Sequence, residues 1–290
     1  MRETEATAAK KPALKIVVAS DKGGVGKTTL AVNIAGWLAR YHSPGRVLFI
    51  DLDPKADATS IWLGYDEAHG NDPGCTIYHV LCADDVQPED AIITAELRVG
   101  RKPSHFTIDV IRCHESASVA NVELLNGVGG ESRLASWLEQ VEGRYDYIVM
   151  DVPPDRGNLL KLNALVAADT VVIPVEPEPF ALVGMQYLNK EVGQINKTIR
   201  KLYRLPELKV AGVVILKFDE RKTMHREALE TVQQTFGKGF LGCVPDRVAV
   251  PMAAKECLDM FGYDSGQSDH WTDVTQAFAD VSKKIIGVTT

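Results

Sequence analysis

Hydrophobic and polar positions follow one another along this chain in regular blocks, from residue 14 almost to the end. Short apolar runs without internal alternation, typical of strands covered on both faces, are separated by amphipathic stretches typical of helices. The runs that predict strands are Leu14–Ala19, Arg46–Asp51, Phe106–Ile111, Tyr145–Asp151, Thr170–Val175, Val210–Leu216 and Phe240–Val244. The stretches that predict helices, in part mixed with loops, are Leu30–Tyr41, Ala56–Gly64, Thr76–Ala83, Arg133–Val141 and residues 180–204, 223–236 and 271–286. This order predicts right-handed crossovers and an α/β fold: a doubly wound, mostly parallel sheet with helices on both faces.

One domain accounts for this pattern. The chain has 290 residues, of which 45% are hydrophobic, so it can bury one sizeable core, and residues 13–290 are predicted to form a single domain. Residues 1–12 are polar, with glutamates among the lysines, so we expect a flexible leader rather than a signal peptide. No apolar run approaches the roughly 18 residues of a membrane span. We therefore expect a cytoplasmic protein without a membrane partner.

The overall charge and the cysteines limit the classes of partner and cofactor. The formal net charge is −7, so a contact with nucleic acid would require a local basic patch rather than a generally basic surface. The five cysteines include no C-x-x-C pair. We expect reduced thiols rather than a disulfide or a metal site.

A glycine-rich loop, Asp21–Thr29, lies between the first predicted strand and the first predicted helix. In that context small residues let backbone N–H groups close on phosphate oxygens, Lys27 reaches the β- and γ-phosphates, and Thr28 offers a hydroxyl to Mg²⁺. The usual first glycine is replaced by Asp21, and a second lysine, Lys22, follows it. The loop predicts ATP and Mg²⁺ as cofactors. Its predicted nucleotide-binding residues are Lys22, Gly23, Gly24, Val25, Gly26, Lys27, Thr28 and Thr29.

Three carboxylates, Asp51, Asp53 and Asp151, follow apolar strands at the edge of the sheet where the loop lies. Open α/β sheets bind ligands at the carboxyl ends of their strands. We expect Asp51 and Asp151 to join Thr28 around the metal ion, and Asp53 to orient the water that attacks the γ-phosphate. A single aspartate after a strand is more often a turn residue or a helix cap, so the assignment rests on the three together.

The loop and the strand ends resemble those of the ParA-type partition ATPases, which belong to the MinD/ParA family and carry a deviant Walker A motif. The resemblance rests on Lys22–Thr29, Val47–Pro54 and Tyr145–Pro154, with weaker similarity over most of residues 14–286. It implies a P-loop NTPase-like fold and a homodimer that sandwiches ATP, in which Lys22 reaches the partner's phosphates. The catalytic residues expected on this basis are Lys22, Lys27 and Asp53.

The same resemblance implies a biological role as well as a fold. Members of the family bind duplex DNA without sequence preference when ATP-bound, and so associate with the nucleoid. A ParB-like centromere-binding protein then stimulates slow hydrolysis, which releases the dimer. The implied function is a switch for plasmid or chromosome partition.

The chain departs from the family pattern at three places. Residues 55–57 (Lys-Ala-Asp) replace a Gln-Gly-Asn-like triplet, so an amide that orients water is missing or replaced, and residues 155–158 carry more charge than usual. Residues 244–247 stand where the family often has Pro-Arg-Asn, a segment that contacts adenine. The residues expected near the adenine, with simple loop packing as the alternative, are Lys217, Pro245 and Asp246.

A basic segment occurs within this acidic chain. Residues 190–226 hold ten lysines and arginines against four acidic residues. Such a concentration is the electrostatic footprint of phosphate-backbone binding, although charged helices are often only solvated faces. Without interleaved aromatic residues for base stacking, sequence-independent binding of duplex DNA is expected. The predicted DNA-binding residues are Arg200, Lys201, Arg204, Arg221, Lys222 and Arg247.

Three other functions are open to a chain with this loop. A MinD-like or cargo-positioning ATPase would act on a membrane or a protein assembly, and membrane binding would need a free apolar face on the last helix. An iron–sulfur carrier would need a pair of closely spaced cysteines, which the sequence lacks. A small-molecule kinase is disfavoured by Lys22. The apolar residues of the last helix, which fit a core helix better, are Phe278, Val281, Ile285 and Ile286.

Overall fold

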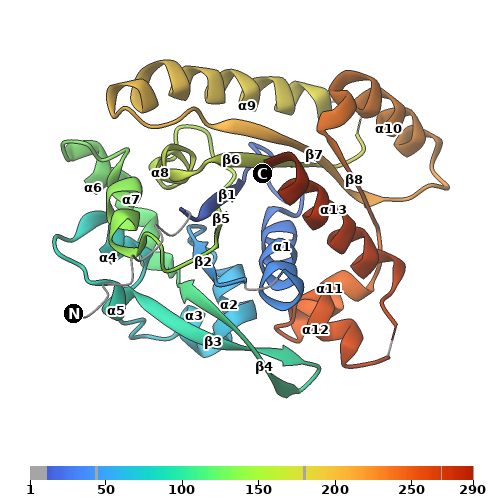
Figure 1. Ribbon diagram of the computed structural model, residues 1–290, viewed down its shortest axis with the longest axis horizontal. Helices are drawn as coiled ribbons and strands as arrows, with labels where there is room; N and C mark the ends of the chain where they lie inside the picture. Colours follow the sequence, from blue (N-terminus) through green and yellow to red (C-terminus); the bar gives the residue numbers. More distant parts are fainter. Residues whose placement is uncertain (1–11, 43–44, 179–180, 269, 290) are drawn as a thin grey trace, which may run out of the picture.

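The computed structural model describes residues 12–42, 45–178, 181–268 and 270–289. Within these ranges one sheet has the strand order β3-β4-β2-β5-β1-β6-β7-β8 (Figure 1). All neighbouring pairs are parallel except β3 and β4, which form an antiparallel hairpin at one edge. The mostly parallel α/β fold is thus confirmed. The strands are β1 (Leu14–Val18), β2 (Val47–Asp51), β3 (Ile92–Val99), β4 (Lys102–Ile111), β5 (Tyr147–Asp151), β6 (Thr170–Val175), β7 (Lys209–Phe218) and β8 (Phe240–Pro245).

Helices cover both faces of the sheet, which explains why the central strands are apolar throughout. Along β1, Val17 packs in one core while Ile16 and Val18 pack in the other. The helices beside Ile16 are α1 (Lys27–Tyr41), α2 (Asp57–Leu63), α11 (Ala249–Lys255), α12 (Met260–Ser265) and α13 (Asp273–Thr289). Those beside Val17 are α3 (Tyr65–His69), α4 (Ile77–Cys82), α5 (Pro88–Ala91), α6 (Ala120–Asn126), α7 (Arg133–Leu138), α8 (Leu159–Ala167), α9 (Ala181–Ile195) and α10 (Thr223–Phe236).

Short helical turns complete the layers and change one predicted element. The stretch predicted as a helix over residues 180–204 forms as α9 followed by one π-helical segment, η3 (Asn196–Arg200). The 3₁₀ turns are η1 (Glu115–Val119), η2 (Glu139–Val141) and η4 (Gly237–Gly239). No helix in the described ranges combines the length and the apolar character needed to cross a membrane.

The edge strand β3 has no counterpart among the predicted elements. Its buried residues, Ala95 and Leu97, alternate with the exposed Thr94 and Glu96. This alternation is typical of a strand covered on one face only, whereas the prediction relied on continuous apolar runs. The helices that were also not predicted are α3, α5, α6, α8, α11 and α12.

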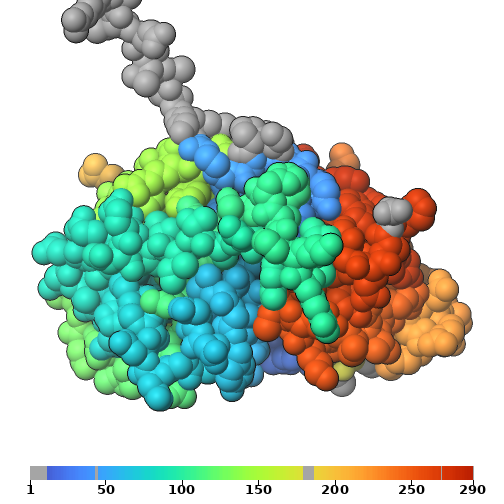
Figure 2. Space-filling model, turned by 90° about the horizontal axis from the view of Figure 1, so that it is seen from below, coloured from blue at the N-terminus to red at the C-terminus, as the bar shows by residue number. Residues whose placement is uncertain are grey.

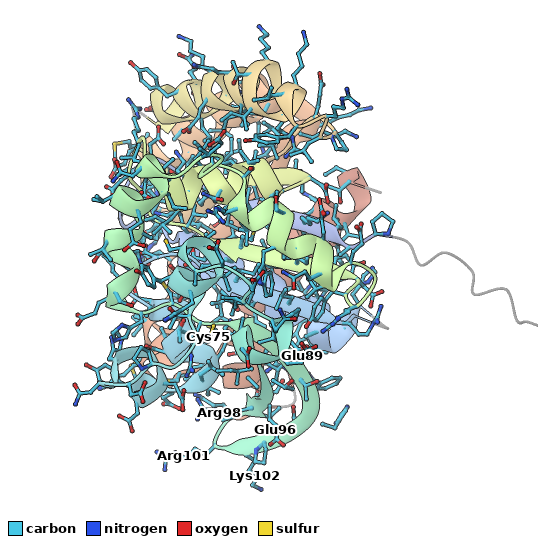
Figure 3. The ribbon with its side chains drawn as sticks, turned by 90° about the vertical axis from the view of Figure 1, so that its left-hand side faces the viewer. Cys75, Glu89, Glu96, Arg98, Arg101 and Lys102 are labelled. Atoms are coloured by element: carbon cyan, nitrogen blue, oxygen red, sulfur yellow. The ribbon has the colours of Figure 1, made fainter. Side chains whose placement is uncertain are left out.

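The β3–β4 hairpin reaches across to the carboxy-terminal part of the chain. In the view from below, the green hairpin lies against the orange and red segment (Figure 2), and the Gly100 N–H donates to the Gly262 carbonyl oxygen at 2.8 Å. At its tip Arg101 and Lys102 point away from the body of the molecule (Figure 3). The hairpin therefore covers α12 and leaves its own charged tip free.

The division into a leader and a single domain stays a prediction. The leader was expected over residues 1–12, and residues 1–11 lie outside the described ranges. The described elements share one sheet with a hydrophobic core on each face. This arrangement brings the carboxyl ends of β1, β2 and β5 together, where the glycine-rich loop and the three aspartates lie.

Candidate nucleotide-binding site

The glycine-rich loop joins the end of β1 to the start of α1. Gly24 and Gly26 have φ values of 76° and 90°. A Cβ atom at position 26 would lie 2.8 Å from Leu216 Cδ1, so both the backbone conformation and the space call for glycine. Gly26 offers no side-chain cap to α1. The first N–H groups of α1 are therefore available to an anion such as phosphate.

Lys27, the first residue of α1, is buried, with 6% of its surface exposed. Burial lowers the pKa of Lys27, and the carboxylates of Asp151 and Asp53 oppose that effect. The ammonium group thus lies in the field of two of the three aspartates. A phosphate in the loop would supply further negative charge and stabilise the protonated form.

Asp151 provides the best candidate for a metal ligand. It ends β5 and is fully buried, and neither carboxylate oxygen meets the geometry of a hydrogen bond to a described residue. Burial, reinforced by Asp51, raises its pKa well above the usual range, although the Thr28 hydroxyl is close enough to act in the opposite direction. An unpaired buried carboxylate beside a threonine hydroxyl fits a hard cation with oxygen ligands, which would keep the carboxylate ionised.

Asp51 has a different environment, which revises its predicted role in the metal shell. It pairs in register with Asp151 on the neighbouring strand, but its own oxygens are engaged. One accepts from the Asp53 N–H at 3.1 Å, and the other accepts from the N–H and the hydroxyl of Thr59 at 2.9 and 2.7 Å. Burial raises its pKa to about 7, against these hydrogen bonds. The arrangement favours a positioning role that fixes the segment after β2.

Asp53 is the most accessible of the three aspartates, at 9% exposed against 0% for the other two. Its side chain accepts from the Lys55 N–H at 3.1 Å, and its carbonyl oxygen accepts from the Ala56 N–H at 2.8 Å. Ala56 has a φ of 54°, the left-handed conformation that glycine adopts without strain. The turn therefore keeps the backbone shape expected of the family's glycine while replacing the residue itself.

The described residues contain no cluster of three or more histidine, cysteine, aspartate or glutamate side chains that could hold a metal by themselves. A Mg²⁺ ion at Thr28 and Asp151 would therefore need phosphate oxygens and water to complete its shell, as Mg²⁺ usually does.

Lys22 lies at the outer side of the loop, with 49% of its side chain exposed. Its ammonium donates to Glu176 Oε2 and to Glu178 Oε2, both at 2.6 Å. Burial alone would lower the pKa of Lys22, but these two hydrogen bonds outweigh it and raise the pKa. Within a single chain, the second lysine is thus held by carboxylates that follow β6.

Lys217 contacts the phosphate loop, whereas the prediction placed it near the adenine. Its ammonium donates to the Gly24 carbonyl oxygen and to Glu176 Oε1, both at 2.6 Å, and its backbone has a φ of 56°. Pro245 pairs with Phe218 at the ends of β8 and β7, so the three predicted residues do lie in neighbouring segments beside the loop. The adenine contact of Pro245 and Asp246 stays a prediction.

Arg200 was wrongly predicted to contact DNA. It is 2% exposed, and its guanidinium donates to four backbone carbonyl oxygens, so it cannot reach a DNA phosphate. The other predicted residues are exposed, although Arg221 is paired with Asp219 and Arg247 with Asp273. The basic residues that remain accessible are Lys201, Arg204, Arg221, Lys222 and Arg247.

Sequence reasoning missed a charge network at the first position of the loop. Asp21 accepts from the buried Lys161 at 2.6 Å and from Arg156 at 2.7 Å, and Lys161 also donates to Glu191 of α9 at 2.8 Å. Burial alone would raise the pKa of Asp21, but these partners lower it. Two sequence features could have indicated this network: Asp21 replaces the usual glycine, and Arg156 lies in the unusually charged segment after β5.

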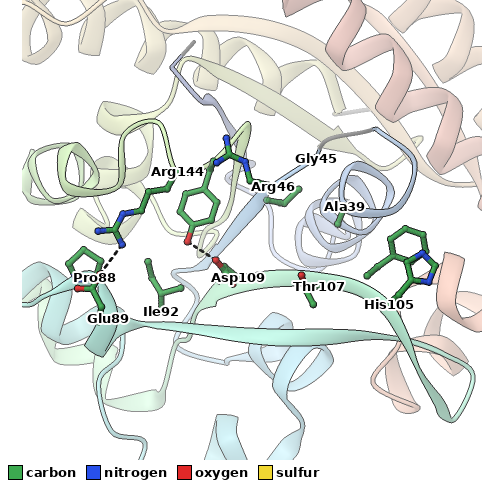
Figure 4. A pocket seen from close by; sticks show the side chains of 13 residues that line it. Ala39, Gly45, Arg46, Pro88, Glu89, Ile92, His105, Thr107, Asp109 and Arg144 are labelled. Atoms are coloured by element: carbon green, nitrogen blue, oxygen red, sulfur yellow. Dashed lines mark hydrogen bonds and ion pairs between the residues drawn. The ribbon is translucent and has the colours of Figure 1, made fainter. Parts of the chain in front are cut away.

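A cavity of about 520 Å³ lies at the opposite, amino ends of β2 and β5 (Figure 4). Several of its polar groups are already paired: Tyr145 donates to Asp109 at 2.7 Å, and Arg144 donates to Glu89 at 3.0 Å. The carboxyl edge of the sheet, rather than this cavity, carries the chemistry of nucleotide binding.

Comparisons with known proteins identify the family of the chain. A family described as "AAA domain" matches residues 13–205. The sporulation initiation inhibitor protein Soj of Bacillus subtilis is 34% identical over 250 residues, covering 86% of this chain and 90% of the relative. The chromosome partitioning protein ParA of Myxococcus xanthus is 35% identical over 224 residues, covering 77% and 71%. Two uncharacterized Mycobacterium tuberculosis relatives match at 34% over 226 residues, and the match spans only 65% of their length.

A solved structure supports the fold. The plasmid partition protein of Borrelia burgdorferi B31 bound to AMPPNP is 24% identical, with a TM-score of 0.73 over 96% of this chain and 99% of that one. The chain belongs to the ParA/Soj family of partition ATPases.

Proposed function

We propose that the chain is a Mg²⁺-dependent ATPase that acts as a dimerising switch in plasmid or chromosome partition. The observation that carries the proposal is Lys22, a half-exposed second lysine on a glycine-rich phosphate loop. A P-loop enzyme that works as a monomer has no evident use for this cation. In a sandwich dimer, Lys22 instead leaves Glu176 and Glu178 and reaches the phosphates held by the second copy.

The chain's own residues divide the work at the phosphates. The N–H groups at the start of α1 and the ammonium of Lys27 would bind phosphate oxygens, and Thr28 and Asp151 would hold Mg²⁺. When bound, the ion neutralises charge on the phosphates. Asp53 orients the attacking water, and Asp51 holds the Asp53 N–H in place. The adenine lies near Pro245 and Asp246, beside the loop.

The basic residues supply the second activity, sequence-independent binding of duplex DNA by the ATP-bound dimer. A dimer presents two copies of the patch, so it binds a long polyanion far better than the monomer does. In the cell, the protein would be cytoplasmic and associated with the nucleoid when ATP-bound, and a ParB-like protein would stimulate hydrolysis. The residues proposed to contact DNA are Lys201, Arg204, Arg221, Lys222 and Arg247.

A MinD-like role on a membrane has less support. The apolar side chains of α13 that would have to enter a bilayer are packed in the core, each no more than 8% exposed. A protein cargo would use the same charges as DNA, so it is the competing account. The residues concerned on α13 are Phe278, Val281, Ile285 and Ile286.

Binding of labelled duplex DNA of arbitrary sequence tests the proposal, measured with ATP, with ADP and without nucleotide. We expect binding with ATP only, falling steeply as salt rises because each neutralised phosphate releases counterions. The double variant Lys201→Glu/Arg204→Glu should lose binding and keep ATP turnover without DNA. Lys255→Glu, an exposed lysine on α11, is the matched control. No affinity of the ATP-bound protein at low salt would contradict the DNA role and favour a protein cargo.

A further inference from the structure

Four aliphatic side chains form an exposed line along η1, α6 and the turn that follows. Val119, Val122, Leu125 and Val128 are 52%, 63%, 73% and 99% exposed, and they recur at every third position. Residues three apart are neighbours on a helix surface, so the side chains on η1 and α6 lie close to one another. We refer to these four residues as the α6 stripe.

The other face of α6 is an ordinary core face. Ala120 and Leu124 are buried and join the core shared with α4 and α8. In Figure 1, α6 lies at the outer left side of the molecule, and Figure 3 looks onto that side. A helix that already has its core contacts gains nothing from a second line of four exposed aliphatic residues. Contiguous apolar surface of this kind marks an interaction site on a folded protein.

The segment that carries the α6 stripe is acidic. Residues 115–132 contain Glu115, Glu123 and Glu131 and no lysine, arginine or histidine, and the arginines that flank the segment, Arg112 and Arg133, are paired with Glu67 and Asp84. Glu123 accepts a hydrogen bond from the Tyr78 hydroxyl at 2.8 Å, and Glu131 accepts one from the Tyr203 hydroxyl at 3.2 Å. These hydrogen bonds restrain both carboxylates. We propose that the α6 stripe docks an amphipathic, basic segment of a partner protein, with apolar side chains on the stripe and cations on the three glutamates.

Two other occupants fit these charges less well. A second copy of this chain, docked stripe to stripe, would bring the same three glutamates of each copy together, and like charges at an interface oppose association. An anionic membrane surface would repel them as well, because such surfaces attract basic rather than acidic segments.

The position of α6 gives the docked segment a route to the nucleotide. Asn121 of α6 accepts from the Leu159 N–H at 2.7 Å. Leu159 begins α8, and the short segment before it runs back to Asp151. A partner that shifts α6 therefore pulls on the segment that follows the proposed metal ligand. This step rests on the proposed ATPase function, whereas docking itself does not.

The test uses two synthetic helix-forming peptides with leucines at i, i+3 and i+4 spacing, one flanked by lysines and one by glutamates. Their binding to the full-length protein is measured by fluorescence anisotropy with and without added salt. The variant Leu125→Glu interrupts the α6 stripe at an exposed position. Val288→Glu is the control, since Val288 is as exposed as Val119, at 52%, but lies on α13 across the sheet. Urea unfolding of both variants checks that they are folded.

We expect the lysine peptide to bind the wild type and Val288→Glu equally, and Leu125→Glu at least tenfold more weakly. Glu115→Lys/Glu123→Lys should weaken the lysine peptide and bind the glutamate peptide better. Equal binding of both peptides by the wild type, or no loss in Leu125→Glu, overturns the proposal. So does a nucleotide-free dimer, or binding to anionic lipid vesicles, that Leu125→Glu abolishes. Basal ATP turnover is measured on the same samples: its absence contradicts the proposed function and leaves the docking result independent.

Discussion

Arg200 offers the sharpest test of how the described side chains hold the fold. Its Nη1 atom donates to the carbonyl oxygens of Leu165, Val166 and Ala168 at 3.2, 2.7 and 2.6 Å, and its Nε atom donates to that of Pro206. The guanidinium thus satisfies the carbonyl groups at the end of α8, which have no partner within the helix. Its positive charge also suits the negative end of the helix dipole.

Replacing Arg200 by alanine should therefore cost a large part of the protein's stability. Each carbonyl oxygen left buried without a partner costs about 1–3 kcal/mol. Because Arg200 borders a cavity of about 420 Å³, water can reach some of them, and we expect a total loss of about 3–5 kcal/mol. For a chain of this size the melting temperature should fall by roughly 5–10 °C.

Equilibrium unfolding in urea, followed by circular dichroism, measures this loss directly. Lys201→Ala is the matched control, because Lys201 is the next residue and is exposed, and its replacement should change the free energy of unfolding by no more than about 0.5 kcal/mol. A loss below about 1 kcal/mol for Arg200→Ala would show that the hydrogen bonds from Arg200 to the carbonyl oxygens do not stabilise the fold to this extent. The result also matters for DNA-binding measurements, because Arg200→Glu would weaken DNA binding by unfolding the protein rather than by removing a DNA contact.

Three further predictions concern the phosphate site. Lys27→Ala should abolish ATP binding in a nucleotide titration, because it removes the cation that the loop brings to the β- and γ-phosphates; a normal titration would refute the loop assignment. Asp53→Ala should hydrolyse no ATP and accumulate as an ATP-bound dimer in gel filtration, since orienting water is needed for cleavage but not for binding; if Asp51→Ala behaves this way and Asp53→Ala does not, the two roles are exchanged. The folded-state pKa of Asp51, about 7, is above the ordinary value, so its contribution to stability is present at low pH and is lost as pH rises from about 4 to 7. Asp51→Asn should therefore reduce the fall in the free energy of unfolding over that range, measured without nucleotide, and an unchanged pH profile would contradict the burial argument.

Local sequence patterns predicted the central part of the fold because each central strand is buried on both faces. Val17 and its neighbours in β1 need no alternation when helices cover both sides, and a continuous apolar run followed by an aspartate locates both β2 and β5. The strand β3 is buried on one face only, so its buried and exposed residues alternate, and it was missed. The glycine-rich loop was identifiable because Gly26, Lys27 and Thr28 act through their local backbone geometry.

The remaining features depend on contacts between residues far apart in the chain. No local pattern tells that Lys22 lies against Glu176, 154 positions away, or that Asp21 neutralises the buried Lys161. A surface position is the ordinary expectation for an arginine, so only the packing of α8 against the turn after η3 identifies Arg200 as buried. The unequal environments of the aspartates have the same origin, because Thr59 hydrogen-bonds to Asp51 whereas Asp151 meets no such partner among the described residues.

In the proposed function, Lys22 acts across an ATP-dependent dimer. Sedimentation velocity of the wild type, of Lys22→Ala and of a control variant tests it most directly, each with AMPPNP and Mg²⁺ and again without nucleotide. The control is Lys283→Ala, which removes an exposed lysine of α13. We expect dimers of the wild type and of Lys283→Ala with nucleotide only. Lys22→Ala should bind the nucleotide yet stay monomeric. A Lys22→Ala dimer as stable as that of the wild type would contradict the account.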